Sequence, residues 1–207
     1  MYLVPPTYED LIWIFAQYQN VEIMEMFGGG DLGPAKILLQ YRSGTLVVAT
    51  IMSIATRRRI GFVVIYPPYG GDFNFWEIGM AITAFADRNA FNAINATDAV
   101  GYYMFSHLRA RFVGWRIRED NLACDAMVRR VGYPAGETLE IGGHSHMIYR
   151  LDKAGWAKRE FKIEAGEKQN ADGIGVPYTI LQPPMYEPRS QPETIGKSIS
   201  NDMVATV

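Results

Sequence analysis

The chain has 207 residues, of which 48% are hydrophobic and 20% are charged, as is normal for a soluble protein with a real core. A formal net charge of −2 excludes a general electrostatic attraction to nucleic acid, and the sequence contains no clear nucleic-acid site. The single cysteine, Cys124, excludes an internal disulfide framework and a zinc site built on several thiolates.

Neither a membrane span nor a signal peptide is predicted. The longest apolar runs, Leu46–Met52 and Phe62–Tyr66, are far shorter than the ~20 residues that span a bilayer. Met1–Pro6 carries no basic region that would begin a secretion signal. Because cysteine is so scarce, a reducing compartment is the simpler expectation, and we place the protein in the cytoplasm of its (host) cell.

The first part of the chain predicts one strand and then helices. Thr7 with Asp10 three residues later is a variant of the capping box, which marks a helix start. Gly28-Gly29-Gly30 lacks the Lys-Ser/Thr pair of a phosphate loop and is interpreted as a helix end. The predicted elements are a strand at Met1–Val4, a helix after Thr7 that continues or restarts over Val21–Phe27, and a helix at Pro34–Tyr41.

The middle of the chain predicts an antiparallel meander. Three apolar, β-rich segments follow one another with short breaks, which favours strands that pair with their sequence neighbours. They are Leu46–Ile54, Ile60–Tyr66 and Phe75–Ile82.

The remaining elements alternate between helix and strand and end in a hairpin. They are a helix over Asn92–Arg109, a strand at Arg111–Ile117, a helix capped by Asp120 or Asn121 and ended by Gly132, and strands at Glu137–Ile141 and His146–Leu151 around Gly142-Gly143. This order predicts an α+β fold with helices on both faces of a mixed, largely antiparallel sheet.

The end of the chain differs in composition. Five of the 11 prolines lie there, and no apolar period lasts more than a few residues. Such a segment cannot bury enough surface to order itself. We therefore expect one domain over residues 1–155 and a polar, Pro-rich extended tail over residues 156–207.

Three stretches are similar to the GNAT superfamily of N-acetyltransferases. Trp76–Ile82 resembles the family's fourth strand, and Arg88–Ala93 falls where the family has its acyl-CoA loop, Arg/Gln-x-x-Gly-x-Gly/Ala. Arg118–Tyr133 resembles the family's strand, its Asn-x-x-Ser helix and its closing Gly-Phe. The resemblance implies a GNAT-like acyltransferase fold for residues 1–155.

In that family the fourth strand and its neighbour splay apart, and the backbone groups left unpaired hold the pantetheine arm of acetyl-CoA as an added strand would be held. The pyrophosphate rests on N–H groups at the start of the following helix. The resemblance therefore implies acetyl-CoA as the cofactor of an active protein. It implies cofactor-binding roles for Ile78, Met80, Ile82, Arg88, Asn89, Asn92, Ala93 and Asn121.

The chain departs from the family pattern at the loop and at the acid. Phe91 stands where the first loop glycine belongs, so its ring would crowd the phosphate site, and Asn89 replaces another common glycine. Val128 takes the place of the tyrosine that serves as the acid in many members. Cys124 takes the place of the Asn-x-x-Ser serine; it is a candidate weak donor, but buried packing is the favoured interpretation.

Glu77 is a candidate general base, because the resemblance places it next to the acyl site; the alternative is a strand carboxylate that faces solvent. His144 and His146 share one side of a predicted strand, but no third ligand is evident. We therefore interpret them as hairpin surface and predict no metal site. Arg57-Arg58-Arg59 is interpreted as a solvated turn rather than a phosphate contact.

Two functions are consistent with these features. One is acetyl transfer from acetyl-CoA to a primary amine. The other is a catalytically weak or silent structural subunit that reuses the fold in a larger assembly such as a bacteriophage virion, where GNAT-like domains occur. In that case the tail would contact neighbouring subunits and the protein would be located in the virion. The altered loop slightly favours the second function.

Overall fold

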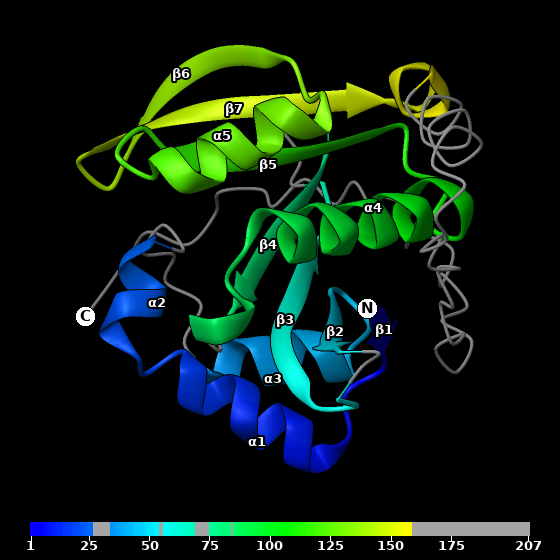
Figure 1. Ribbon diagram of the computed structural model, residues 1–207, viewed down its shortest axis with the longest axis vertical. Coiled ribbons are helices and arrows are strands. Elements are labelled where there is room, and N and C mark those ends of the chain that lie inside the picture. Colours follow the sequence, from blue (N-terminus) through cyan, green and yellow to red (C-terminus); the bar gives the residue numbers. More distant parts are fainter. Residues whose placement is uncertain (27–33, 54–55, 69–74, 84, 159–207) are drawn as a thin grey trace, which may run out of the picture.

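The computed structural model describes residues 1–26, 34–53, 56–68, 75–83 and 85–158 (Figure 1). The predicted helix end at Gly28-Gly29-Gly30 and nearly all of the predicted tail lie outside the described residues. The elements are β1 (Tyr2–Val4), α1 (Tyr8–Gln17), α2 (Val21–Met26), α3 (Pro34–Arg42), β2 (Val47–Met52), β3 (Arg59–Tyr66), β4 (Trp76–Ile82), a short 3-10 helix η1 (Phe85–Asp87), α4 (Ala90–Ser106), β5 (Phe112–Arg118), α5 (Leu122–Val131), β6 (Ala135–Ile141) and β7 (His144–Asp152).

One seven-stranded sheet in the order β1-β2-β3-β4-β5-β7-β6 forms the centre of the molecule. Strands β2, β3 and β4 pair antiparallel as the predicted meander, and β1 pairs antiparallel with β2. Strands β5, β7 and β6 also pair antiparallel. Only β4 and β5 run parallel among the described strands, because α4 connects them as a crossover. The predicted α+β class with a mixed, largely antiparallel sheet is therefore confirmed.

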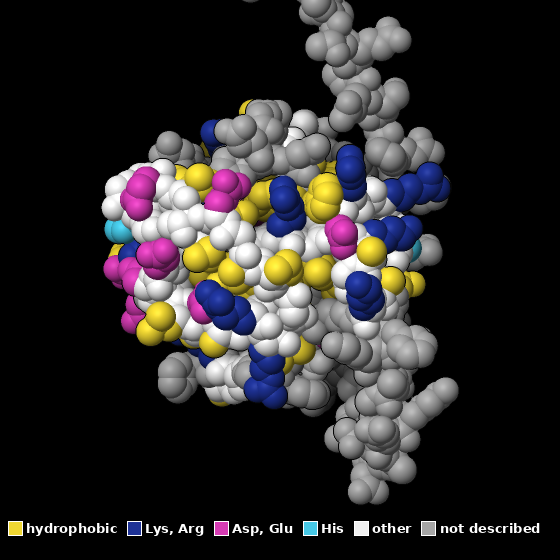
Figure 2. Space-filling model, turned by 90° about the horizontal axis from the view of Figure 1, so that it is seen from above, with side chains coloured by type: hydrophobic (Ala, Val, Ile, Leu, Met, Phe, Trp, Pro, Cys, Tyr) yellow, Lys and Arg dark blue, Asp and Glu magenta, His cyan; other side chains and the backbone are white. Residues whose placement is uncertain are grey.

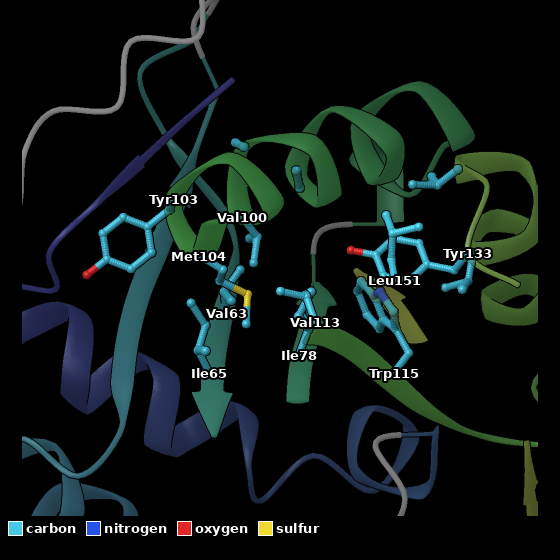
Figure 3. Packing of buried hydrophobic residues seen from close by; sticks show 14 of the residues in the cluster. Val63, Ile65, Ile78, Val100, Tyr103, Met104, Val113, Trp115, Tyr133 and Leu151 are labelled. Carbon is cyan, nitrogen blue, oxygen red and sulfur yellow. The ribbon is translucent and has the colours of Figure 1, made fainter. Parts of the chain in front are cut away.

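Helices cover both faces of the sheet, as predicted, and one buried cluster lies on each face. One cluster packs α4 and α5 against residues such as Val63, Ile78, Val113 and Trp115; Figure 3 shows how these side chains meet beneath α4. The other cluster packs α1 and α3 against the opposite face, with Ile14 and Ile37 fully buried over Phe62 and Val64. We call the first face the α4–α5 face and the second the α1–α3 face.

Local sequence signals set the helix ends. The Thr7 hydroxyl accepts from the Asp10 N–H at 3.1 Å, and the Asp10 carboxylate accepts from the Thr7 N–H at 2.9 Å, which completes the predicted capping box. Asn121 caps α5 by accepting from the Cys124 N–H at 3.2 Å. Gly132 ends α5 at φ 90°, a left-handed conformation that suits glycine.

The predicted turn at Arg57-Arg58-Arg59 is exposed. Within it, Arg59 pairs with Asp10 at 3.2 Å and lies over the Trp13 ring. On the described part of the face shown in Figure 2, basic, acidic and apolar side chains are interspersed. None of the helices in the described ranges combines the length and the apolar character needed to cross a bilayer.

The packed core extends to Trp156, one residue beyond the predicted boundary at residue 155. Trp156 is 5% exposed and stacks on Phe105 of α4, with ring centroids 5.6 Å apart. Gly101 makes this approach possible, since a Cβ atom there would lie 2.5 Å from the indole ring. The helical segment 153–158 therefore closes the core under α4.

Candidate functional site

The parallel strands β4 and β5 touch at one end and then diverge. They are paired only at Trp76 with Val113 and at Glu77 with Gly114. Both strands continue for several residues past this point, to Ile82 and Arg118. The result is a V-shaped opening in the middle of the sheet, with its apex at Glu77 and its wide end near Arg118.

The backbone of β4 presents alternate residues to this opening. Thr83 donates its N–H to the Ile60 carbonyl at 2.9 Å, so Thr83 pairs with β3. Because the direction of backbone groups alternates along a strand, those of Ile78, Met80 and Ile82 point away from β3 and into the V. These are the three strand residues for which the family resemblance implies contact with pantetheine.

The backbone of β5 follows the same rule on the other side. Glu119 donates its N–H to the Ser145 carbonyl at 3.0 Å, continuing the ladder with β7. The backbone groups of Arg116 and Arg118 therefore point into the V. Two strand edges, each with backbone groups that point into the V, thus face one another across a gap. Such a gap can accept an extended chain that has its own amide groups.

A cavity of about 580 Å³ occupies the V and reaches both faces of the sheet. Its volume is in the range of sites that hold small organic ligands. Seven of the eight residues for which the resemblance implies cofactor binding line it: Ile78, Met80, Ile82, Arg88, Asn89, Ala93 and Asn121. The eighth, Asn92, does not line the cavity; its side-chain amide instead donates to the Asp87 carbonyl at 3.0 Å.

The start of α4 closes the wide end of the cavity. Asn89 caps this helix by accepting from the Asn92 N–H at 2.8 Å. Arg88 donates to the Ile82 carbonyl at 3.0 Å and to the Thr83 carbonyl at 3.2 Å, which holds its guanidinium at the end of β4. A helix N-terminus beside a guanidinium attracts anions. The side chain of Phe91, predicted to crowd this position, lies outside the described residues.

Glu77 lies at the apex of the V on the α1–α3 face, opposite Tyr66 of β3. Its side chain is 18% exposed and accepts from Arg116 Nε and Nη2 at 3.0 Å each. Burial raises the pKa of this carboxyl above its usual 4.5, although Arg116 opposes the shift. Glu77 is therefore a largely buried carboxylate at the cavity rather than one that faces open solvent; its catalytic role stays a prediction.

Cys124 lines the cavity from α5 and packs against the core of the α4–α5 face, as the favoured interpretation predicts. Burial, assisted by Asp125, raises the pKa of its thiol to about 12. The thiol therefore stays protonated at neutral pH and is a poor nucleophile. Val128, at the position of the missing tyrosine, is 0% exposed within the core and offers no polar group to the cavity.

The interpretation of both histidines as hairpin surface is wrong for His146. His144 is exposed, but His146 is only 2% exposed and lines the cavity. It pairs across the sheet with Arg118, which places it on the α1–α3 face. In the described ranges no three His, Cys, Asp or Glu side chains are grouped to hold a metal ion.

Helix α2 forms one side of the cavity, a position that the sequence alone does not predict. Arg118 donates to the Glu25 carbonyl at 2.8 Å and also pairs with Asp120, so α2 is anchored over the end of β5. Glu22, Ile23 and Met24 then line the α1–α3 side of the cavity. No local sequence pattern indicates this contact, because it joins a short helix to a strand far away in sequence.

No family model matches the chain, and no curated protein matches it by sequence. Solved structures do match it. A spermidine N-acetyltransferase from Vibrio cholerae in complex with CoA and spermine superposes with a TM-score of 0.63 at 14% identity, over 75% of this chain and 96% of that one. The aminoglycoside acetyltransferase AAC(6')-Ib in complex with coenzyme A gives the same four values.

Mycobacterium smegmatis RimJ in complex with CoA-disulfide matches with a TM-score of 0.59 at 16% identity, over 79% of this chain and 88% of that one. At such low identity these similarities establish the fold alone. The chain has a GNAT-like fold, as the family resemblance implies.

Proposed function

We propose that the chain is an acetyl-CoA-dependent N-acyltransferase that acts on a primary amine. The observation that carries the proposal is the V between β4 and β5, where the backbone groups of Ile78, Met80 and Ile82 face a cavity of about 580 Å³. The structures of similar fold that contain CoA or acetyl-CoA support it. The cytoplasm, where acetyl-CoA is available, is the proposed location.

The residues divide the cavity into a cofactor side and an acceptor side. The edge of β4 would hold the pantetheine amides, and Arg88 with the start of α4 would hold the phosphates. Bound acetyl-CoA would supply the acyl group that is transferred, in the form of a thioester. The acceptor amine would enter from the α1–α3 face, beneath α2 and beside Glu77.

Glu77 would act as the general base. As the amine nitrogen bonds to the thioester carbon and the carbon–sulfur bond breaks, one proton passes from the amine to the carboxylate of Glu77. The departing sulfur takes an equivalent proton from solvent water, because Val128 offers no donor and the Cys124 thiol, with a pKa of about 12, is a weak one. Because neither Val128 nor Cys124, among the described residues, supplies an effective acid, we expect a modest turnover rate.

The second candidate is a silent structural subunit of a larger assembly, such as a virion. The specific observation in its favour is the burial of Val128, which leaves the acid position without any polar group. In this alternative the cavity would bind no acetyl-CoA, and the tail would contact neighbouring subunits. Acetyl-CoA binding therefore distinguishes the two candidates.

Acetyl-CoA should stabilise the chain and should lose affinity when the cavity mouth is blocked. Ala123 is an exposed residue of α5 that lines the cavity, so Ala123→Trp places an indole in the opening. We expect acetyl-CoA to bind at least tenfold more weakly by calorimetry. For the unchanged chain, acetyl-CoA at one hundred times its Kd should raise the free energy of unfolding by about 2.7 kcal/mol.

The matched control is Leu122→Trp. Leu122 precedes Ala123 on the same helix and is 73% exposed, but it does not line the cavity. This variant should bind acetyl-CoA as the unchanged chain does. Absence of any binding heat and thermal shift at millimolar acetyl-CoA would overturn the proposed function, and equal weakening by both variants would place the cofactor elsewhere.

A further inference from the structure

The acceptor side of the cavity contains a buried histidine that the acetyl transfer outlined above does not use. His146 is 2% exposed, and its Nδ1 lies 2.9 Å from the His144 carbonyl oxygen. A carbonyl oxygen only accepts, so Nδ1 carries the hydrogen, and in the neutral ring Nε2 is the acceptor. Nε2 makes no hydrogen bond within the described part of the chain, although His146 lines the cavity.

The position of His146 in the sheet assigns it to the acceptor side. Its cross-strand partner Arg118 lies two residues beyond Arg116 on β5, so all three share the α1–α3 face. Met147 and Tyr149, which flank His146 and Ile148 along β7, belong to the opposite cluster with α4 and α5. His146 therefore lies at the wide end of the V, away from Glu77 at the apex.

The charges that line the cavity differ between its two sides. The cofactor side carries Arg88 and Arg130. The acceptor side carries Glu22, Glu77 and Arg116, and the guanidinium of Arg116 is engaged by Glu77. Glu22 forms no ion pair with the other described residues. The acceptor side thus offers two hydrogen-bond acceptors that have no partner among the described residues: the Glu22 carboxylate and His146 Nε2.

We propose that His146 and Glu22 form a second recognition point for the acceptor, which therefore carries a protonated nitrogen in addition to the amine that is acetylated. The inference rests on the proposed function, with the reacting amine beside Glu77. An ammonium group supplies several N–H donors and a positive charge, which match a lone-pair nitrogen and a carboxylate. Diamines and longer oligoamines are the acceptor class that meets this requirement; His146 is a positioning residue, not a base.

The test is calorimetric titration of the full chain with 1,4-diaminobutane and with butylamine, without acetyl-CoA. The two probes have the same chain length and differ in one terminal amine. We expect the diamine to bind about tenfold more tightly. Glu22→Gln should reduce this ratio to less than threefold, whereas Glu140→Gln, at an exposed β6 position outside the cavity, should leave it unchanged.

His146 is tested by two substitutions that differ in hydrogen bonding. His146→Gln keeps an acceptor oxygen and should retain part of the diamine preference, whereas His146→Leu should lose it. Circular dichroism checks that each variant is folded. If both histidine variants unfold, the result for Glu22→Gln decides the inference. Equal affinity for the two probes, or a preference that survives Glu22→Gln, overturns the inference. Acetyl-CoA binding, measured separately, decides the proposed function, so the two can fail independently.

Discussion

Replacing Glu77 by glutamine should lower kcat/KM for amine acetylation by at least a hundredfold and leave acetyl-CoA affinity unchanged. A positioned general base contributes about 10²–10⁴-fold to such reactions. Glutamine has nearly the same shape and can still accept from Arg116, so the apex of the V should keep its geometry. The measurement is steady-state acetylation of a diamine, together with calorimetric titration of acetyl-CoA.

The pH dependence provides an independent readout of the same group. Burial raises the pKa of Glu77 above 4.5, and the residue acts as a base only when deprotonated. As pH falls through this raised pKa, the carboxylate takes up a proton and kcat/KM should fall. The acidic limb of the profile should therefore lie above pH 4.5 and should be absent from Glu77→Gln.

Glu137→Gln is the matched control, because Glu137 is an exposed glutamate on β6 that does not line the cavity. It should retain full activity and the full acidic limb. If Glu77→Gln keeps more than a tenth of the activity, or if its acidic limb is unchanged, Glu77 is not the base.

Replacing Trp156 by alanine should lower the free energy of unfolding by about 3–5 kcal/mol, the range for large aromatic side chains removed from a core. The indole is 5% exposed, stacks on Phe105 and fills the space over Gly101. For a domain of this size the unfolding midpoint should fall by roughly 10 °C. Calorimetry or thermal unfolding followed by circular dichroism measures both quantities.

Chain ends chosen around Trp156 test the predicted domain boundary. A chain that ends at residue 155 lacks the indole and should be destabilised like Trp156→Ala, whereas a chain that ends at residue 158 should unfold like the full protein. Lys153→Ala, at an exposed position nearby, controls for disturbance of the segment 153–158. Equal stability of the two shortened chains would show that Trp156 contributes little to the core.

Most of the fold could be predicted because its signals are local. The capping pair Thr7 and Asp10, the strand-forming runs of the meander and the closing Gly132 each depend on residues a few positions apart, and each is found in the structure. The family resemblance added what local patterns do not contain, namely that β4 and β5 would be neighbours and would diverge.

The acceptor side could not be predicted because its residues meet through long-range contacts. Helix α2 is held over the sheet by the hydrogen bond from Arg118 to the Glu25 carbonyl, and Arg118 also pairs across the strands with the buried His146. The ion pair between Glu77 and Arg116 likewise joins two strands that α4 separates in sequence. The spacing of residues within a single element does not predict such contacts. A polar residue on a strand is therefore predicted to lie at the surface.

The short contact between β4 and β5 also bears on the order in which the protein folds. On either side of this seam, β2 with β3, β3 with β4 and β6 with β7 are pairs of strands that follow one another in the chain. The pair β1 and β2 is separated in sequence by α1, α2 and α3, and the pair β5 and β7 is separated by α5 and β6. Most pairs within each half of the sheet therefore have low contact order. The buried face of α4 packs on strands from both halves, so we expect the opening that would admit the ligand to be also the last boundary to close during folding.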